Sequence, residues 1–369
     1  MQWIWQHKKF PDFEYTASLY SKFEQSFYQN SGIIIGSLSH LTNSSIEHLK
    51  IEILTQEAIS TSNIEGEILT RESVQSSIRK HLGLKTDNRK VQANEAGISE
   101  MMVDVYLNFD KTLTYQTLFQ WHAMLMNGRR DIDVIGGYRT HTEPMQIVSG
   151  NLSAPKVFYE APPSEQVLGL MESFIDWYNT TISTTNSPSF IVFAGIVHLY
   201  FEIIHPFEDG NGRIGRALVE KAISQKIKTP ALNSFAKIID SRKKEYYDVL
   251  QSCNHSLNID KWLYFFSTAL LDSQQYTIKL IGFLVAKSKL FLQHNEQLNE
   301  RQLKVLLRVF EEGIEGFKGG LSAANYKTIG NTSPATATRD LQELVLIKAL
   351  YKTGELKHTR YFLNLDSAI

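Results

Sequence analysis

Cysteine is almost absent from the 369-residue sequence, which contains Cys253 alone. A single cysteine excludes an intrachain disulfide, and a chain without disulfides fits a reducing compartment. An excess of charge of one sign is absent too, because 38 Lys and Arg face 39 Asp and Glu, for a formal net charge of −1. This balance excludes a global attraction to nucleic acid or to an anionic membrane, so binding of either kind would need a local patch.

Long apolar runs are also missing. The start, MQWIWQHKKF, lacks the apolar segment of a signal peptide. The apolar run from Ile278 to Ala286 contains Lys279 and is far shorter than the ~20 residues that a membrane-spanning helix needs. We therefore expect a soluble, cytoplasmic protein without membrane contact.

The composition is that of a globular protein, with 43% hydrophobic and 21% charged residues. The chain is longer than one that ordinarily folds around a single hydrophobic core, so we predict two or three domains. We predict a mainly α protein in three parts: an N-terminal helical extension at 1–90, a central helical domain at 91–290 and a small domain at 291–369.

Helical periodicity dominates the central part. Apolar residues at helical spacing predict helices over about 92–107, 164–178 and 210–226. The segment from Phe190 to Ile204 is apolar on almost every side, which is typical of a helix at the centre of a domain.

Two short segments break this helical pattern. Met145–Val148 and Lys156–Tyr159 favour β-strands, and the turn residues between them predict a hairpin, with an irregular loop as the alternative. After about Asn295, three predicted helices precede two predicted strands, Val345–Leu350 and Thr359–Leu363. That order resembles a winged helix.

The segment that carries the chemistry is HPFEDGNGRIGR, residues 205–216. Pro206 disfavours helical geometry at His205, so the chain leaves the preceding helix there. A histidine at the end of a rigid buried helix is a candidate general base, because neutral imidazole accepts a proton near pH 7. A loop histidine taken alone is more often structural.

An anion site follows His205 in the same segment. Glycines at the start of a helix let backbone N–H groups approach a phosphate, and a carboxylate beside them, Asp209, suits a bridging magnesium ion. Arg213 and Arg216 share one face of the predicted helix and can both reach the phosphates. Each feature alone has an ordinary explanation, such as a turn or a pair of surface arginines. Together they describe a nucleotide site with a hydroxyl nucleophile.

The segment resembles the signature of the Fic family at every fixed position. The resemblance implies a helical core with a β-hairpin flap, and transfer of AMP from ATP, with Mg²⁺, to a Ser, Thr or Tyr hydroxyl of a target protein. It implies that His205 is the base, that Phe207 anchors the loop and that Asp209 binds the metal. The implied ATP-binding residues are Gly210, Asn211, Gly212, Arg213, Ile214, Gly215 and Arg216.

Two further segments resemble the same family. In RKKEYYDVLQSCN, the residues Tyr246, Tyr247 and Asn254 would line the adenine and ribose pocket, although core tyrosines on a helix are the ordinary alternative. The flap residues that would clamp the backbone of the target by strand addition are Ile147, Val148, Ser149 and Gly150.

The segment from Thr61 to Gly66 resembles the inhibitory motif of the family. Glu65 would pair with Arg216 and occupy the arginine that the γ-phosphate needs, so ATP would bind in a misaligned pose. Without the Fic resemblance, Glu65 would be a surface glutamate before a helix-ending glycine. The aromatic start with Trp3 and Trp5 resembles the N-terminal extension of bacterial Fic proteins. We expect it to hold the inhibitory helix, with a partner-binding arm as the alternative.

Three alternatives stay open. The chain could remove AMP from modified proteins or transfer another phosphate-containing group, and it could be a DNA-binding regulator that only senses ATP. The residues from Lys327 to Arg360 include six Lys or Arg and three Asp or Glu, a thin basic footprint. We therefore favour protein contact or dimer support over DNA for the C-terminal part. Self-modification and a homodimer are further expected partnerships.

Overall fold

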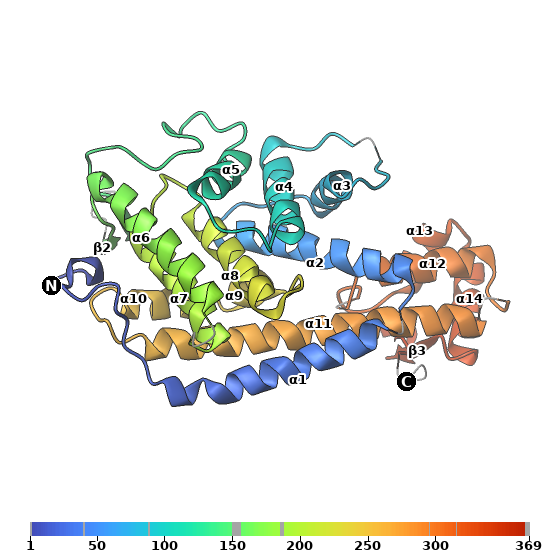
Figure 1. Cartoon of the computed structure of the whole chain (residues 1–369). Coiled ribbons are helices and arrows are strands. Elements are labelled where there is room, and N and C mark those ends of the chain that lie inside the picture. The colour runs from blue at the N-terminus through green and yellow to red at the C-terminus, as the bar shows by residue number, and fades with distance from the viewer. Residues whose placement is uncertain are drawn as a thin grey trace. The chain divides into compact units, whose positions relative to one another are not determined.

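The computed structural model describes residues 2–39, 41–87, 89–149, 156–184, 188–294, 296–314 and 316–365, and the chain is mainly helical (Figure 1). The helices are α1 (Ser21–Leu38), α2 (Asn43–Ile64), α3 (Arg71–His81), α4 (Ala93–Leu107), α5 (Tyr115–Leu125), α6 (Ser164–Ser183), α7 (Phe190–Ile204), α8 (Asn211–Ile227), α9 (Phe235–Ser241), α10 (Lys243–Ser252), α11 (Asp260–His294), α12 (Glu300–Glu311), α13 (Ala323–Gly330) and α14 (Pro334–Leu346). The strands are β1 (Gln146–Ser149), β2 (Lys156–Glu160), β3 (Leu350–Thr353) and β4 (Arg360–Leu363), and the short 3-10 helices are η1 (Ile4–Gln6), η2 (Ala17–Leu19) and η3 (Leu356–His358).

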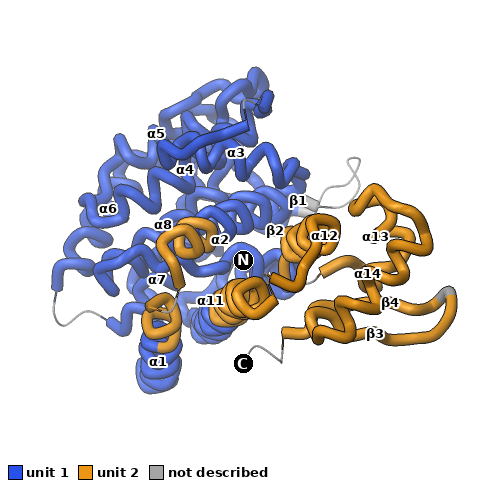
Figure 2. The backbone as a smooth tube through the Cα atoms, turned by 90° about the vertical axis from the view of Figure 1, so that its right-hand side faces the viewer, with its two compact units in different colours: residues 1–32, 50–277 blue, residues 33–49, 278–369 orange. Residues whose placement is uncertain are grey.

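The chain divides into two compact units (Figure 2). The first contains residues 1–32 and 50–277, and the second contains 33–49 and 278–369. The first unit therefore includes β1, β2 and the helices from α3 to α10, whereas the second includes α12, α13, α14 and the β3–β4 hairpin. The three-part division at residues 90 and 290 stays a prediction.

Helix α7 forms the centre of the first unit. Every residue of α7 except Glu202 is buried, as its apolar sequence predicts, and α7 packs against α8. Helix α11 approaches α7 closely at Gly195, whose carbonyl accepts a hydrogen bond from Trp262 Nε1 at 2.8 Å. This packing fixes the direction of α7. It therefore also fixes the position at which α7 ends, between Ile204 and His205.

The predicted hairpin is present. β1 and β2 pair in antiparallel register from Gln146 opposite Glu160 to Ser149 opposite Lys156, with an irregularity after Ile147. The central helices lie within a few residues of their predicted bounds, apart from α6, which continues to Ser183.

The second unit has the predicted order of three helices and a hairpin, but the first strand was predicted too early. Val345 and Leu346 of the predicted strand Val345–Leu350 belong to α14, whose helical pattern continues through them, and β3 begins at Leu350. Ser333 caps α14 by accepting a hydrogen bond from the Thr336 N–H, and β3 pairs with β4. Asp340 of α14 is 1% exposed and receives hydrogen bonds from Arg301 Nε and the Tyr326 hydroxyl. The buried carboxylate thereby ties α14 to both preceding helices.

Among the residues that the structure describes, no helix combines the length and the apolar character needed to cross a bilayer.

Candidate active site

Left-handed backbone stands at both ends of the loop between α7 and α8. His205 ends α7 with φ 50° and ψ 59°, and Gly210 precedes α8 with φ 81°. A β-carbon at Gly210 would lie 3.0 Å from the Met126 side chain, so glycine suits both the backbone and the space. Arg139 fixes the loop, because its Nε donates to the His205 carbonyl at 2.8 Å and its backbone N–H donates to the Pro206 carbonyl at 3.0 Å.

The His205 side chain is 12% exposed and neutral at physiological pH. Burial lowers the pKa of its imidazole to about 4, and the charge of Arg139 acts in the same direction. Its Nδ1 lies 3.9 Å from the Glu202 carboxylate, one turn earlier on α7. Burial also raises the pKa of Glu202 to about 8. A neutral imidazole held at the end of a rigid helix can accept a proton.

Phe207 anchors the loop, as predicted. Its ring is fully buried and stacks on the His122 ring of α5 with the centroids 4.2 Å apart. The Asn211 amide spans the turn, donating to the Phe207 carbonyl at 2.8 Å and accepting from the Phe207 N–H at 3.0 Å. These two hydrogen bonds fix the turn and thereby the position of the Asn211 backbone N–H at the start of α8.

The first turn of α8 presents backbone donors. The first intrahelical bond runs from the Ile214 N–H to the Gly210 carbonyl at 3.0 Å. The N–H groups of Asn211, Gly212 and Arg213 come before that bond and therefore have no intrahelical acceptor. A helix N-terminus of this kind favours an anion.

Two of the predicted ATP-binding residues face the core instead. The Ile214 side chain is 0% exposed. Gly215 lies against α7, where an added β-carbon would meet Glu202 Oε1 at 2.6 Å and His198 Nδ1 at 2.9 Å. Gly215 therefore allows α8 to pack closely on α7, and a role of either residue in ATP binding stays a prediction.

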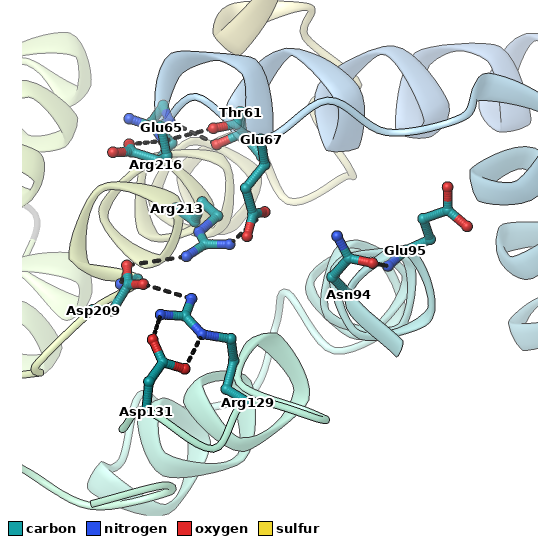
Figure 3. Close-up of polar contacts among 11 residues, drawn as sticks. Thr61, Glu65, Glu67, Asn94, Glu95, Arg129, Asp131, Asp209, Arg213 and Arg216 are labelled. Atoms are coloured by element: carbon teal, nitrogen blue, oxygen red, sulfur yellow. Dashed lines mark hydrogen bonds and ion pairs between the residues drawn. The ribbon is translucent and has the colours of Figure 1, made fainter. Parts of the chain in front are cut away.

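Arg216 is paired with the end of α2, as the sequence predicts (Figure 3). Its Nη2 lies 2.6 Å from Glu65 Oε1, and its Nε donates to the Thr61 hydroxyl at 2.6 Å. Burial alone would lower the pKa of Arg216, but the Glu65 charge holds it above its ordinary value. The Glu65 carboxylate lies directly over Gly212, in the position that a β-carbon there would claim.

Arg213 is paired with a second carboxylate from the segment after α2. Its Nη1 lies 2.8 Å from Glu67 Oε2, and its Nη2 lies 3.1 Å from Asp209 Oδ1. Arg129 contacts the other Asp209 oxygen at 2.8 Å and is itself held by Asp131, so charges alternate in a row (Figure 3). Both arginines of the signature are thus neutralised by the chain itself.

Asp209 fits the predicted role in magnesium binding. Burial would raise its pKa, but Arg213 and other hydrogen-bond donors hold the pKa below its usual range, so the side chain is a carboxylate. The described residues contain no group of three or more His, Cys, Asp or Glu side chains that could hold a metal. A single carboxylate beside an anion site suits Mg²⁺, which in proteins binds one or two carboxylates together with phosphates and water.

A pocket of about 580 Å³ opens beside this loop, a size typical of sites for small ligands. It brings together residues predicted from distant parts of the sequence. Its lining includes Glu65, Ile147, His205, Gly212, Tyr246, Tyr247 and Asn254.

The three predicted adenine-pocket residues differ in their surroundings. The Tyr246 hydroxyl is buried and lies 2.7 Å from His198 Nε2. Tyr247 is 42% exposed and directs its hydroxyl to the Ile64 carbonyl at the end of α2. Asn254 donates its amide to the Phe158 carbonyl of β2 at 2.7 Å. Tyr247 is therefore the one of the three whose side chain remains substantially open to a ligand.

The predicted flap is formed by β1. Ile147 pairs with Tyr159 and is 42% exposed. Val148 and Ser149 continue β1, opposite Val157 and Lys156. The fourth predicted flap residue, Gly150, lies outside the described residues.

The two tryptophans of the aromatic N-terminus contact the flap hairpin and the segment after α10. Trp5 Nε1 donates to the Glu160 carbonyl of β2 at 2.8 Å. The Trp3 ring stacks on His255 and meets the Tyr159 ring edge to face. The role of the N-terminal extension in holding the inhibitory helix stays a prediction.

Sequence reasoning missed Arg139, Glu67 and Glu202. Arg139 is 2% exposed and also donates to the Ser164 hydroxyl at 2.9 Å, so it connects the His205 loop to the start of α6. Its contacts are all to distant segments and leave no local pattern. Glu67 stands two residues after Glu65, and this second acidic residue was the available signal.

Comparison with known families adds two matches. Residues 112–223 match the model of the Fic/DOC family, and residues 3–84 match a domain of unknown function, DUF4172. The Fic/DOC match contains the hairpin, α7 and the loop from His205 to Arg216.

Similar curated proteins carry the name "Protein adenylyltransferase Fic". The relative from Drosophila willistoni is 23% identical over 225 residues, which is 59% of this chain and 40% of that protein. The relative from Drosophila mojavensis is 24% identical over 221 residues, with the same shares of the two chains. The chain thus spans about 40% of the length of these relatives.

Solved structures share the fold. A Fic family protein from Desulfovibrio desulfuricans has a TM-score of 0.50 at 21% identity and covers 92% of this chain and 95% of its own. A Fic domain containing signaling protein from Bacteroides thetaiotaomicron has a TM-score of 0.52 at 19% identity, over 69% of this chain and 96% of its own.

Proposed function

Because the chain contains a Fic/DOC domain, we propose that it is a protein adenylyltransferase, which moves AMP from ATP to a Ser, Thr or Tyr hydroxyl of a protein. The observation that carries the proposal is the position of the neutral His205 beside the anion-binding end of α8, at a pocket bordered by the exposed Ile147 of β1. The name of the Drosophila relatives supports the same reaction class.

In the proposed reaction, His205 accepts the proton of the acceptor hydroxyl. The hydroxyl oxygen forms a bond to the α-phosphorus, the bond from that phosphorus to the β-bridging oxygen breaks, and pyrophosphate leaves with the electron pair. Arg139 holds the backbone of the base in place through the His205 carbonyl. A lowered pKa keeps the imidazole free of a proton before the acceptor arrives.

The nucleotide would lie over the N-terminus of α8. The N–H groups of Asn211, Gly212 and Arg213 face the phosphates, and the Arg213 and Arg216 side chains neutralise their outer charges. Asp209 is the residue that would hold Mg²⁺, which supplies further neutralisation of phosphate charge when bound. Tyr247, partly exposed in the pocket, offers an aromatic ring on which the adenine of ATP would stack.

Glu65 acts as the brake in this proposal. Its carboxylate holds Arg216 and covers Gly212, which are two groups that the phosphates need. ATP bound beside this carboxylate would sit out of line for the attack, and a misalignment of about 1 Å can slow a reaction ~100-fold. The wild-type chain should therefore transfer AMP slowly.

Removal of AMP from a modified protein is the second candidate. The observation that favours it is again the Glu65 carboxylate, which lies over Gly212 beside His205 in the same pocket. A carboxylate in this position can orient a water molecule, with which the phosphorus–oxygen bond to the protein would be cleaved. The intact arginine pair favours a triphosphate donor and hence transfer.

The deciding experiment uses ATP labelled at the α-phosphate. The Glu65→Gly variant and the wild-type chain are incubated with labelled ATP, Mg²⁺ and a cell lysate, and labelled hydroxyl residues are mapped by mass spectrometry. Strong protein labelling by the variant alone supports transfer with a brake, and label on the chain itself identifies self-modification. A parallel reaction with pre-labelled protein tests removal. Equal labelling by variant and wild type would sink the inhibitory role of Glu65.

A further inference from the structure

The two edges of the flap hairpin differ. On the inner edge of β2, Tyr159 pairs with Ile147, and the Ala161 N–H just beyond the strand bonds the Met145 carbonyl. Backbone groups alternate along a strand, so the carbonyls of Phe158 and Glu160 point to the outer edge. Both outer carbonyls have partners from distant parts of the chain.

The outer edge of β2 is closed by two side-chain donors. Trp5 Nε1 donates to the Glu160 carbonyl at 2.8 Å, and Asn254 Nδ2 donates to the Phe158 carbonyl at 2.7 Å. These two donors match the two-residue spacing of the carbonyls. No further strand can pair with β2 while they are in place.

The N-terminal arm, residues 2–6, is fastened to the segment that supplies Asn254. The Ile4 N–H donates to the Asn254 carbonyl at 2.7 Å, and His255 Nδ1 donates to the Gln2 carbonyl at 2.8 Å. The Trp3 ring stacks on the His255 ring with the centroids 4.6 Å apart. The arm and the two residues Asn254 and His255, which follow α10, therefore form one clasp.

The clasp is also connected to the end of α7, just before His205. The Trp3 ring meets Tyr159 edge to face at 5.6 Å, and the Tyr159 hydroxyl donates to the Ile203 carbonyl at 2.6 Å. Ile203 stands two residues before His205 on α7. The position of β2 is thus fixed relative to the proposed base by contacts that begin in the arm.

We propose that the N-terminal arm positions the flap for the acceptor, with Trp5 as the main positioning residue. The arm closes the outer edge of β2, so an extended segment of the acceptor protein adds to β1, which in the described part of the chain pairs with β2 alone. This inference rests on the proposed function for the nature of the acceptor, but the clasp itself does not.

The first test measures the clasp without any transfer reaction. Trp5→Phe removes the N–H donor and keeps an aromatic ring, and Trp177→Phe is the matched control on α6, where the ring packs on Phe193 and Tyr200. Hydrogen exchange is followed for residues 156–161 of the full chain. We expect exchange to quicken roughly tenfold in Trp5→Phe, the effect of one ordinary hydrogen bond, and not in the control. Unchanged exchange in Trp5→Phe, or the same change in both variants, would overturn the clasp.

The second test separates positioning from general damage. In the Glu65→Gly background, AMP transferred to lysate proteins is compared with AMP released to water, and the dissociation constant of ATP is measured alongside. Trp5→Phe should lower protein labelling about fivefold while AMP release and ATP binding stay within twofold, because water does not need the flap. Equal loss of labelling and release contradicts a positioning role. If Glu65→Gly itself transfers no AMP, the proposed function fails and the exchange test still decides the clasp.

Discussion

In the proposed function, the pocket has a nucleotide side and an acceptor side, and the two are built differently. On the nucleotide side, both arginines of the signature already pair with carboxylates of the chain, Arg216 with Glu65 and Arg213 with Glu67 and Asp209. On the acceptor side, β1 pairs only with β2 among the described residues, and Ile147 is 42% exposed. The charge of an arginine can be neutralised by one carboxylate side chain. The unpaired edge of a strand, in contrast, can be covered only by the backbone of another segment. Under the proposed function, inhibition therefore acts on the nucleotide side, where a single residue suffices.

The largest effect is expected from a substitution that removes the proposed base on the acceptor side and leaves the nucleotide side intact. His205→Ala in the Glu65→Gly background should lower AMP transfer by ~10²–10⁴-fold, because the acceptor hydroxyl loses its base. The rate of label incorporation from α-labelled ATP measures this loss. ATP affinity should stay unchanged, since the arginines and the α8 N-terminus are intact. A large loss of ATP affinity would mean that His205 belongs to the nucleotide side.

The next largest effect is expected from a substitution that removes an ion pair on the nucleotide side. Glu65→Gln keeps the size of the side chain but removes the charge that holds Arg216, whose Nε and Nη2 still donate to Thr61. We expect transfer to rise on the order of 100-fold, through correct alignment of ATP. Initial rates at saturating ATP measure the change. A lower KM for ATP with an unchanged rate at saturating ATP would show that Glu65 blocks binding rather than alignment.

A smaller effect sharpens the comparison between the two arginines. Glu65 and Glu67 side chains are both 28% exposed, and Glu67→Gln is therefore a matched substitution on Arg213. Arg213 keeps Asp209 at 3.1 Å, so the rise in transfer should be only about threefold, in the range of a partly exposed ion pair. The same initial-rate assay applies. An effect as large as that of Glu65→Gln would make Glu67 an equal part of the brake.

The smallest effect concerns pH. The pKa of His205 is lowered to about 4, so in the Glu65→Gly variant the base stays unprotonated as the pH falls from 7 to 5. The acid-side decline of kcat/KM should begin only near pH 4, whereas an ordinary imidazole would already be roughly thirtyfold depleted of its neutral form at pH 5. A pH profile of transfer checks this. A midpoint near 6.5 would show that His205 is solvated when it acts.

Local sequence patterns predicted much of this site, because the loop from His205 to Arg216 is contiguous and its backbone demands are local. The hairpin and the Glu65–Arg216 pair were also predicted, the pair through resemblance to a family motif. Asn254 shows the limit of such patterns: its amide is used by the Phe158 carbonyl. Which of several possible partners a polar side chain meets depends on tertiary packing.

The contacts of Arg139 and Trp5 could not be predicted for a related reason. Each joins segments that are far apart in sequence, and a lone arginine or tryptophan carries no periodic signal. In the second unit, the order of helices and strands follows from caps and turns, so it was predictable. The resemblance of these elements to a winged helix, and protein contact as their role, stay predictions.

In the proposed function, the Glu65 carboxylate over Gly212 is a tethered competitor for the aligned position of the phosphate. The Glu65 carboxylate rests on Gly212, in space that a bound phosphate would share. Because Glu65 belongs to the same chain, its effective concentration at that spot is fixed by the fold and does not dilute. In the proposed function, the fraction of bound ATP that is aligned for attack is then set by the fraction of time the carboxylate is away, so any event that frees the end of α2 raises the transfer rate.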